Sequence, residues 1–310
     1  APAMAALAQG SETAPARKRG DWQTMREAGN VGQAAMAALI PPSPGIRTTT
    51  YHATAPDGAQ IELRWYSTHT ANEATATGPA VLYAHGGGMV LGTLDTYDTL
   101  LSMYVARSGV PFLSVGYRLA PESRGTALAE DVYTGLTWLA DHAAGLGVDP
   151  ARIAVMGDSG GSAPTAGTAI LARDRGLPIA RQILIYPMLD DRNQTPDPAL
   201  APFVTWSYDD NYTAWHAVLG DDLGHADVSP VAAPGRLKDF TGLPPAYLEV
   251  GDLDIFRDET IAYAQGLARA GVPVELHVHP AVPHGWERFA PEATIAQRAY
   301  TDRLRVITAL

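Results

Sequence analysis

The 310-residue sequence contains no cysteine. Disulfide bonds, a thiolate nucleophile and a zinc site built on cysteine sulfur are therefore excluded. No apolar run approaches the length that spans a bilayer, so we expect no membrane span. Basic residues are also scarce, because 22 Lys and Arg stand against 33 Asp and Glu, a formal net charge of −11. This acidic balance disfavours nucleic acid and anionic membranes as partners.

The start of the chain lacks the charge order of a secretion signal. Residues 1–10 are rich in alanine and have no basic residue ahead of them, whereas Arg17-Lys18-Arg19 follow them. A secretion signal carries its basic residues first. We therefore expect a cytoplasmic protein, and the absence of an initial Met leaves trimming of the N-terminus open. The oligomeric state is also open, with a homodimer among the options.

Short apolar runs alternate with helical patterns along most of the chain. The patterns predict strands at 46–54, 59–67, 80–84, 111–115, 152–156, 181–186, 246–250 and 273–279. They predict helices at 125–144, 161–174, 257–270 and 291–309, the last opening at Pro291. This alternation favours one α/β domain with a mostly parallel sheet, helices on both faces and ligands above the C-terminal ends of the strands.

Residues 157–161 read Gly-Asp-Ser-Gly-Gly and follow the predicted strand 152–156. A serine flanked by glycine two residues away on each side fits the nucleophile elbow of an α/β-hydrolase. The turn holds its serine at strained backbone angles, and side chains on the flanking residues would collide with the adjoining strand or helix. The pattern predicts Ser159 as a nucleophile raised above the sheet.

A glycine loop, His85-Gly86-Gly87-Gly88, follows the predicted strand 80–84. Acyl transfer places negative charge on a carbonyl oxygen, and fixed backbone amides stabilise it there. In the elbow architecture another donor is the amide after the nucleophile, here Gly160. A phosphate-binding loop is the alternative, but a dinucleotide fingerprint from Gly86 would need glycine where Leu91 stands.

Three carboxylates follow the predicted strand 246–250, in the chain order of serine, acid and histidine that the elbow requires. Asp258 begins the next helical pattern and suits helix capping. Asp252 sits tight against the strand end. We choose Asp254 as the acid and keep Asp252 as the alternative. The carboxylate must orient an imidazole, so we expect it to be shielded from water.

One of the nine histidines is well placed as a base. His284 follows the last predicted strand in a turn, Val282-Pro-His-Gly-Trp286. His277 and His279 share one face of that strand with Glu275, which indicates a polar strand face. A metal pair is the alternative, but no third ligand at a recognisable spacing accompanies them. His85 is expected to shape the glycine loop.

These motifs resemble those of one known family. His85-Gly-Gly-Gly88, Tyr117-Arg-Leu-Ala-Pro-Glu122, Gly157-Asp-Ser-Gly-Gly161, Tyr186-Pro187, Asp254-Ile-Phe-Arg-Asp-Glu259 and His284-Gly285 have the order and spacing of the hormone-sensitive lipase-like esterases. These are also called bacterial family IV carboxylesterases, of the α/β-hydrolase fold. The resemblance, over residues 46–310, implies Ser159, Asp254 and His284 as a catalytic triad, with Gly87, Gly88 and Gly160 as the oxyanion hole.

The resemblance also implies a function and a domain division. We expect a serine carboxylesterase that hydrolyses short- to medium-chain esters, small molecules, with no cofactor and no metal. The same residues would serve an amidase, peptidase or lactonase. A non-catalytic receptor is a further alternative, although such proteins lose a triad member. We expect a hydrolase core of residues 46–189 and 236–310, an N-terminal cap segment of residues 1–45, and a helical cap insertion of residues 190–235.

The cap insertion supplies candidates for substrate binding. It is rich in aromatic residues, which are Phe203, Trp206, Tyr208, Tyr212 and Trp215. Ordinary packing is one explanation of each, but as a group above a nucleophile they favour an apolar pocket. We select Trp206 and Tyr208, together with Met89 beside the glycine loop.

The chain departs from the family pattern at a few positions. Gly160 stands where alanine is common, and its freedom is expected to loosen the oxyanion hole slightly. Gly116 and Ile255-Phe256 also differ from the usual residues. Pro164 falls about five residues into the expected helix, at the edge of where a missing N–H is harmless. None of these departures removes a catalytic atom.

Overall fold

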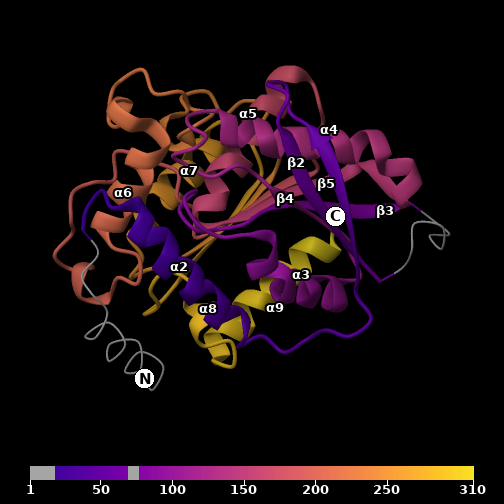
Figure 1. Ribbon diagram of the computed structural model, residues 1–310, viewed down its shortest axis with the longest axis horizontal. Helices are drawn as coiled ribbons and strands as arrows, with labels where there is room; N and C mark the ends of the chain where they lie inside the picture. The colour runs from indigo at the N-terminus through magenta and orange to yellow at the C-terminus, as the bar shows by residue number, and fades with distance from the viewer. Residues whose placement is uncertain (1–17, 69–76) are drawn as a thin grey trace.

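The computed structural model describes residues 18–68 and 77–310 and contains an eight-stranded sheet (Figure 1). Its strand order is β1-β2-β4-β3-β5-β6-β7-β8. The strands from β4 to β8 in this order run parallel, whereas β1 and β2 pair antiparallel with their neighbours. Their bounds are β1 (Arg47–Thr54), β2 (Gln60–Ser67), β3 (Gly78–Ala84), β4 (Phe112–Gly116), β5 (Val148–Asp158), β6 (Arg181–Ile185), β7 (Ala246–Gly251) and β8 (Val274–His279). The predicted strands and the mostly parallel sheet are confirmed.

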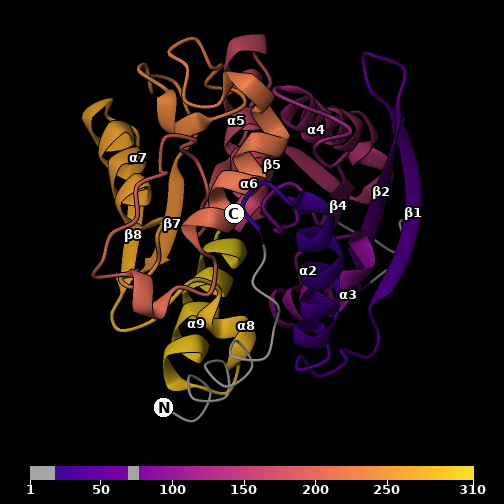
Figure 2. The same ribbon diagram turned by 60° about the vertical axis from the view of Figure 1, so that its left-hand side comes forward.

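Helices cover both faces of this sheet, as predicted. One face packs against α3 (Leu94–Ser108) and α9 (Thr294–Thr308), which lie side by side in Figures 1 and 2. The other face packs against α4 (Ala127–Leu146), α5 (Ser162–Arg175) and α7 (Arg257–Arg269). Strands β3, β4, β5, β6 and β7 are mostly buried between these layers, because apolar side chains point to both faces of the sheet. The edge strand β1 is largely exposed.

Helix α3 is missing from the predicted helices. Its residues include four Thr or Ser and two Tyr, which have modest helix propensity, so the sequence gives a weak helical signal. Two other interactions stabilise it. Thr93 and Thr96 exchange hydrogen bonds between side chain and backbone at its N-terminus. Tyr97, Leu100, Leu101 and Tyr104 are buried against the sheet.

The two prolines near helix starts have different outcomes. A short 3₁₀ turn over Ser159–Gly161 precedes α5, so Pro164 is the third residue of the helix, where no N–H is required. Helix α9 begins at Thr294 rather than at Pro291 as predicted. Ala293 N donates to Ala290 O at 3.0 Å, and this turn separates Pro291 from the helix.

Two helices outside the sheet layers lie next to each other near the C-terminal ends of the strands. They are α2 (Trp22–Ala37) and α6 (Tyr208–Leu219), seen together in Figures 1 and 2. Asp21 caps α2 by accepting from Thr24 N at 3.1 Å, and Ser207 caps α6 by accepting from Asp210 N at 3.1 Å. The chain thereby brings residues 22–37 against residues 208–219.

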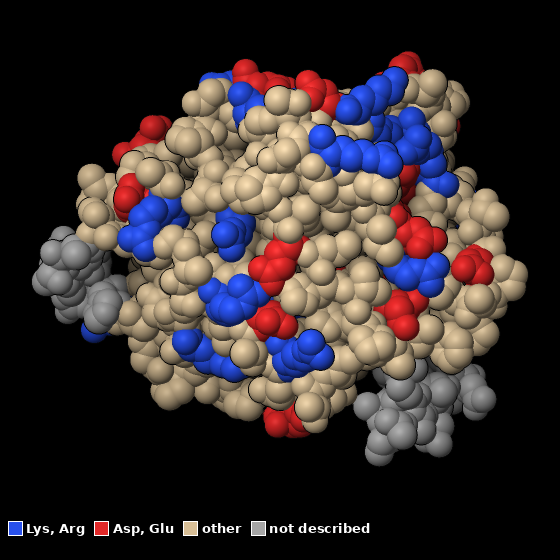
Figure 3. Space-filling view, turned by 180° about the vertical axis from the view of Figure 1, so that it is seen from behind, with Lys and Arg blue, Asp and Glu red and all other residues tan. Residues whose placement is uncertain are grey.

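Charge is spread over the face of the molecule that Figure 3 shows. On this face, acidic and basic side chains are interspersed among uncharged ones.

None of the helices within residues 18–68 and 77–310 combines the length and the apolar character that crossing a bilayer requires.

A buried cluster of charges joins the sheet to the C-terminal helices. Arg303 of α9 donates from Nε to Glu249 Oε1 of β7 at 2.9 Å. It also donates from Nη1 to Glu287 Oε1 of α8 (Trp286–Phe289) at 2.9 Å. Tyr186 OH donates to the same Glu287 oxygen at 2.8 Å. Because α8 begins two residues after His284, this cluster fixes the segment that carries His284.

We expect Arg303→Met to lower the free energy of unfolding by about 3–5 kcal/mol, because two carboxylates would remain buried without their cation. Urea denaturation measures this loss. Arg305→Met, on the same helix, is the control, since Arg305 is half exposed and pairs with Glu275 on the surface. Equal urea midpoints for the two variants would contradict the prediction.

The same cluster gives stability a dependence on acid pH. Burial raises the pKa of Glu249, but Arg303, together with His279 and Tyr247, more than offsets this and lowers the pKa to about 2, from an ordinary 4.5. A depressed pKa in the folded state contributes stability above pH 4.5 that is lost as the pH falls toward 2. The difference in free energy of unfolding between wild type and Arg303→Met should therefore be larger at pH 7 than at pH 3.

Candidate active site

Ser159 lies at a sharp turn between the end of β5 and helix α5. Its backbone φ is +52°, in the left-handed region that a residue with a side chain rarely adopts. A Cβ at Gly157 would lie 2.6 Å from Gly161 O, and a Cβ at Gly161 would lie closer than 3.0 Å to Ala84 O. The turn is therefore compatible only with glycine at these two positions.

Ser159, His284 and Asp254 form a continuous chain of hydrogen bonds. Ser159 Oγ lies 2.8 Å from His284 Nε2, and His284 Nδ1 lies 2.7 Å from Asp254 Oδ2. Asp254 is fully buried and its Oδ1 accepts from Phe256 N at 3.0 Å. A base beside a hydroxyl, oriented by a shielded carboxylate, is the arrangement that activates a serine for attack on a carbonyl.

The neighbouring acids have other partners. Asp252 Oδ1 accepts from Ala281 N at 2.6 Å and so holds the turn that follows β8. Asp258 pairs with Arg257 on the surface at 2.7 Å. Of the three carboxylates after β7, Asp254 is the one in contact with His284.

Aromatic rings pack against the imidazole of His284, and one hydroxyl holds its backbone. The rings of Tyr186 and Phe256 meet it edge-on, with centroids 4.7 and 5.1 Å away. Thr205 Oγ1 donates to the carbonyl oxygen of His284 at 2.7 Å. The imidazole is 12% exposed. It is therefore fixed in orientation but open to the cavity described below.

The glycine loop 85–88 lies directly beside the elbow. Gly87 and Gly88 have φ of +119° and +59°, and Met89 has +64°. The backbone amides of Gly87 and Gly88 donate to no other described residue. His85 stacks on Tyr117, with ring centroids 4.6 Å apart, and burial lowers the pKa of His85. The neutral imidazole thus packs beneath the loop, whose free amides are available to an oxyanion.

Gly160 contacts the glycine loop with no room for a side chain. A Cβ at this position would lie 2.7 Å from Met89 N and closer still to Gly88 N. These are backbone atoms, which cannot move aside as a flexible side chain can. Rather than loosening the site, glycine here permits a closer approach of the loop.

Asp158, beside the nucleophile, is held by residues that the sequence motifs do not indicate. Tyr83 OH donates to its Oδ1 at 2.6 Å, and Tyr97 OH donates to its Oδ2 at 3.1 Å. Burial raises the pKa of both tyrosines, so both remain donors. A Cβ at Gly86 would meet Tyr97 Oη and Asp158 Oδ2 at 2.8 and 2.9 Å. The cluster therefore braces the first glycine of the loop.

A cavity of about 380 Å³ opens above Ser159 and His284. Trp206 lines it as predicted, and it also covers Gly88. Met89 and Tyr208, which were also selected from the sequence, do not line it, because both side chains belong to the hydrophobic core. The other lining residues include Gly29, Gly32, Gln33, Met36, Leu91, Tyr97, Tyr186, Arg288 and Phe289. Several come from α2, within the residues 1–45 that the family resemblance assigns to a cap.

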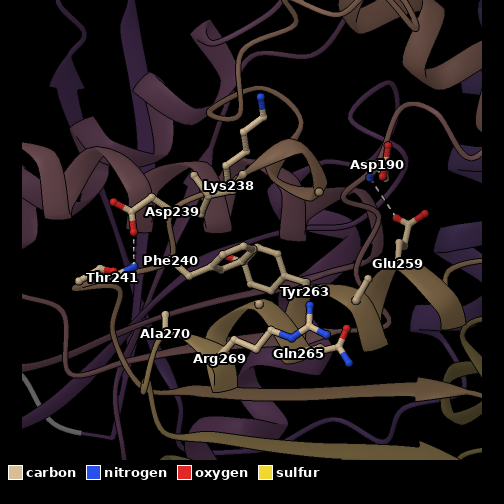
Figure 4. A pocket seen from close by; sticks show the side chains of 14 residues that line it. Asp190, Lys238, Asp239, Phe240, Thr241, Glu259, Tyr263, Gln265, Arg269 and Ala270 are labelled. Carbon is tan, nitrogen blue, oxygen red and sulfur yellow. Dashed lines mark hydrogen bonds between the residues drawn. The ribbon is translucent and has the colours of Figure 1, made fainter.

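A second, larger hollow of about 510 Å³ lies between residues 235–241 and α7 (Figure 4). The ring of Phe240 meets that of Tyr263 edge-on within it, with centroids 5.2 Å apart. At one end Glu259 accepts a hydrogen bond from Asp190 N at 3.2 Å. Its lining contains neither serine nor histidine. The chemistry of the lining therefore distinguishes the two hollows, and it points to the one above Ser159 and His284.

The two strand histidines have structural partners. His277 Nε2 lies 2.7 Å from Glu275 Oε1. His279 is buried beside Trp286, with ring centroids 5.0 Å apart. In residues 18–68 and 77–310 no group of three histidine or acidic side chains could hold a metal ion.

Comparison with known proteins gives consistent matches. The model of a family described as "alpha/beta hydrolase fold" matches residues 81–288. Esterase LipI of Mycobacterium tuberculosis is 39% identical over 239 residues, covering 75% of this chain and 74% of LipI. Ethyl acetate hydrolase of Pseudomonas putida is 35% identical over 264 residues, covering 82% and 79%. A solved bacterial heroin esterase has a TM-score of 0.88 at 34% identity, covering 100% of this chain and 97% of the other.

We expect Gly160→Ala to lower kcat for p-nitrophenyl butyrate by about 10–100-fold, because the new methyl group displaces the backbone of the glycine loop. Steady-state kinetics measure this effect. Gly145→Ala is the matched control, since a Cβ there meets nothing within 4 Å. An unchanged kcat in Gly160→Ala would show that the glycine loop can accommodate a methyl group at residue 160. Alanine is the commoner residue at this position in the family that the chain resembles.

Proposed function

We propose that this chain, which belongs to the alpha/beta hydrolase fold family and is a carboxylic ester hydrolase of the hormone-sensitive lipase-like group, cleaves short- to medium-chain esters through an acyl-enzyme on Ser159. The observation that carries the proposal is the hydrogen-bonded chain from Ser159 Oγ through His284 to Asp254. The 2.8 Å between Ser159 Oγ and His284 Nε2 is short enough for direct proton transfer. The 2.7 Å between His284 Nδ1 and Asp254 Oδ2 is short enough for the carboxylate to fix the imidazole.

The first half of the reaction forms the acyl-enzyme. His284 Nε2 takes the proton of Ser159 Oγ as that oxygen attacks the ester carbonyl carbon. Asp254 stabilises the imidazolium that results and holds its Nδ1–H. The alcohol then leaves with the proton from His284. In the second half, water attacks the acyl group with His284 again as base, and the acid is released.

The amides of Gly87, Gly88 and Gly160 would stabilise the oxyanion in both halves. Gly87 and Gly88 have no other acceptor among the described residues, and Gly160 lies at the start of a 3₁₀ turn, where amides are unsatisfied. Because the loop and the turn are fixed before substrate arrives, little reorganisation is required at the moment of reaction.

The cavity supports a small ester as substrate. Its volume of about 380 Å³ lies at the lower end of the range for small-molecule sites. Trp206 and the lining residues of α2 support the assignment of residues 190–235 and of the described part of residues 1–45 to a cap over the core. A non-catalytic receptor is disfavoured, because the serine, histidine and carboxylate are all present and in contact.

Ser159→Ala should keep the fold and abolish hydrolysis of p-nitrophenyl butyrate, because no other hydroxyl contacts His284 Nε2 among the described residues. A fluorophosphonate should label wild type at Ser159 and leave the variant unlabelled. Residual esterase activity near the wild-type level, with thermal unfolding unchanged, would exclude Ser159 as the nucleophile.

Asp254→Asn should lower kcat by about 10⁴-fold, because the amide favours the wrong imidazole tautomer. Asp252→Asn is the matched control, since an amide oxygen can still accept from Ala281 N. We expect its kcat to stay within about tenfold of wild type. A larger loss in Asp252→Asn than in Asp254→Asn would reverse the assignment of the acid.

A further inference from the structure

We propose that Arg288 recognises a carboxylate on the substrate, so that the preferred esters carry a second, anionic group. The inference rests on the proposed function, because Arg288 lines the same cavity as Ser159 and His284. It adds a substrate class that the triad and the oxyanion amides do not determine.

Arg288 is buried in the cavity wall with unused hydrogen-bond donors. The residue is 4% exposed, and its Nε and Nη2 have no hydrogen-bond partner among the described residues. Its closest acid is Asp158, whose Oδ2 lies 3.8 Å from Nη1, beyond hydrogen-bond length. Both oxygens of Asp158 already accept from Tyr83 and Tyr97. The guanidinium therefore retains two unsatisfied donors, both closed to solvent in this structure, for a ligand with two acceptor oxygens.

A second buried arginine shows what a purely structural role looks like in this chain. Arg303 is also almost fully buried, and it donates to Glu249, Glu287 and Tyr104. Leaving a buried donor without an acceptor costs about 1–3 kcal/mol. The fold meets that requirement at Arg303, inside the core, and leaves it unmet at Arg288, beside the nucleophile.

The cavity has two kinds of wall. We call Gln33, Tyr97 and Arg288 the polar wall, and all three line the cavity. Gln33 Nε2 reaches its only protein acceptor in the described residues, Gly86 O, at 3.5 Å, the limit of a hydrogen bond. The apolar wall of the cavity consists of Met36, Leu91, Trp206 and Phe289. A substrate with one apolar part and one anionic part matches both walls.

The polar wall carries a cation, Arg288, and the nearest acid, Asp158, also lines the cavity. Burial lowers the pKa of Arg288, but Tyr97 and Asp158 more than offset it and raise the pKa, so the side chain is a cation. Its guanidinium lies 4.4 Å from the centre of the Tyr97 ring, and this contact holds its plane. A planar guanidinium held in place pairs well with the two oxygens of a carboxylate.

The test compares anionic esters with neutral esters of the same shape. Monomethyl adipate is paired with methyl 6-methylheptanoate, in which an isopropyl group replaces the carboxylate. These two esters place the group in the acyl part. The acetate ester of 4-hydroxybutanoate is paired with 4-methylpentyl acetate, and these place it in the alcohol part. Hydrolysis is followed by pH-stat titration at pH 7.

For wild type we expect kcat/KM of the anionic ester to exceed that of its neutral partner about tenfold or more in one of the two pairs. The pair that responds identifies the part of the substrate that faces Arg288. Arg288→Met, which keeps the length and removes the charge, should bring that ratio to one or below. Arg288→Lys, which keeps the charge without the planar fork, should give an intermediate ratio.

Arg305→Met is the control for net charge, because Arg305 is half exposed and belongs to a surface pair with Glu275. Its ratio should equal that of wild type. If Arg288→Met does not fold, the wild-type ratio and that of Arg288→Lys still decide the question.

Two results would overturn the inference. One is a wild type that hydrolyses the neutral esters and shows no preference for either anionic partner. The other is an Arg288→Met variant whose anionic-to-neutral ratio equals that of wild type, which would assign Arg288 to bracing Asp158 instead. If wild type hydrolyses none of the four esters, the proposed function itself is contradicted. This outcome differs from the two results that would overturn the inference on Arg288.

Discussion

The site depends on one strained turn, the left-handed backbone of Ser159. Such a conformation costs about 1–3 kcal/mol and persists only where the surroundings enforce it. Here they do so from several sides. Ser162 Oγ donates to Gly157 O at 2.8 Å, and Met188 N donates to Ser159 O at 3.1 Å. Gly157 and Gly161 allow the helix and the neighbouring strand to close on the turn. The strain is thus balanced by hydrogen bonds and close packing around the turn.

The order of the strands brings the remaining groups to this turn. Parallel strands end at the same edge of the sheet, so whatever follows β3, β5, β7 and β8 meets there. The glycine loop follows β3, which is paired with β5, the strand that leads into Ser159. Asp254 follows β7 and His284 follows β8, and these two strands are also paired. Groups separated by up to 199 residues, from His85 to His284, therefore converge at one edge of the sheet.

The sequence predicts the strands and the polar triad because short, local residue patterns indicate both. Apolar runs mark β3 and β5, and the motifs around Ser159 and His284 are short. The cavity walls are not local. Gln33, Tyr97 and Arg288 come from three helices with no shared motif, and they meet only through the fold. Helix α3, which carries Tyr97, depends on capping and burial more than on helix propensity, so its residues alone give little signal.

Helix α8 contributes one residue to the buried charge cluster and the next residue to the cavity wall. Its neighbouring residues Glu287 and Arg288 face opposite surroundings, the first the buried charge cluster and the second the cavity. Arg303 and Tyr186 hold Glu287 by hydrogen bonds of 2.9 and 2.8 Å, so the short helix cannot turn independently. The same contacts therefore fix the direction of Arg288. Arg288 has its nearest acid, Asp158, at 3.8 Å, and its neighbour Glu287 anchors the segment. The acceptor that we propose for Arg288 would therefore meet a guanidinium already fixed in direction.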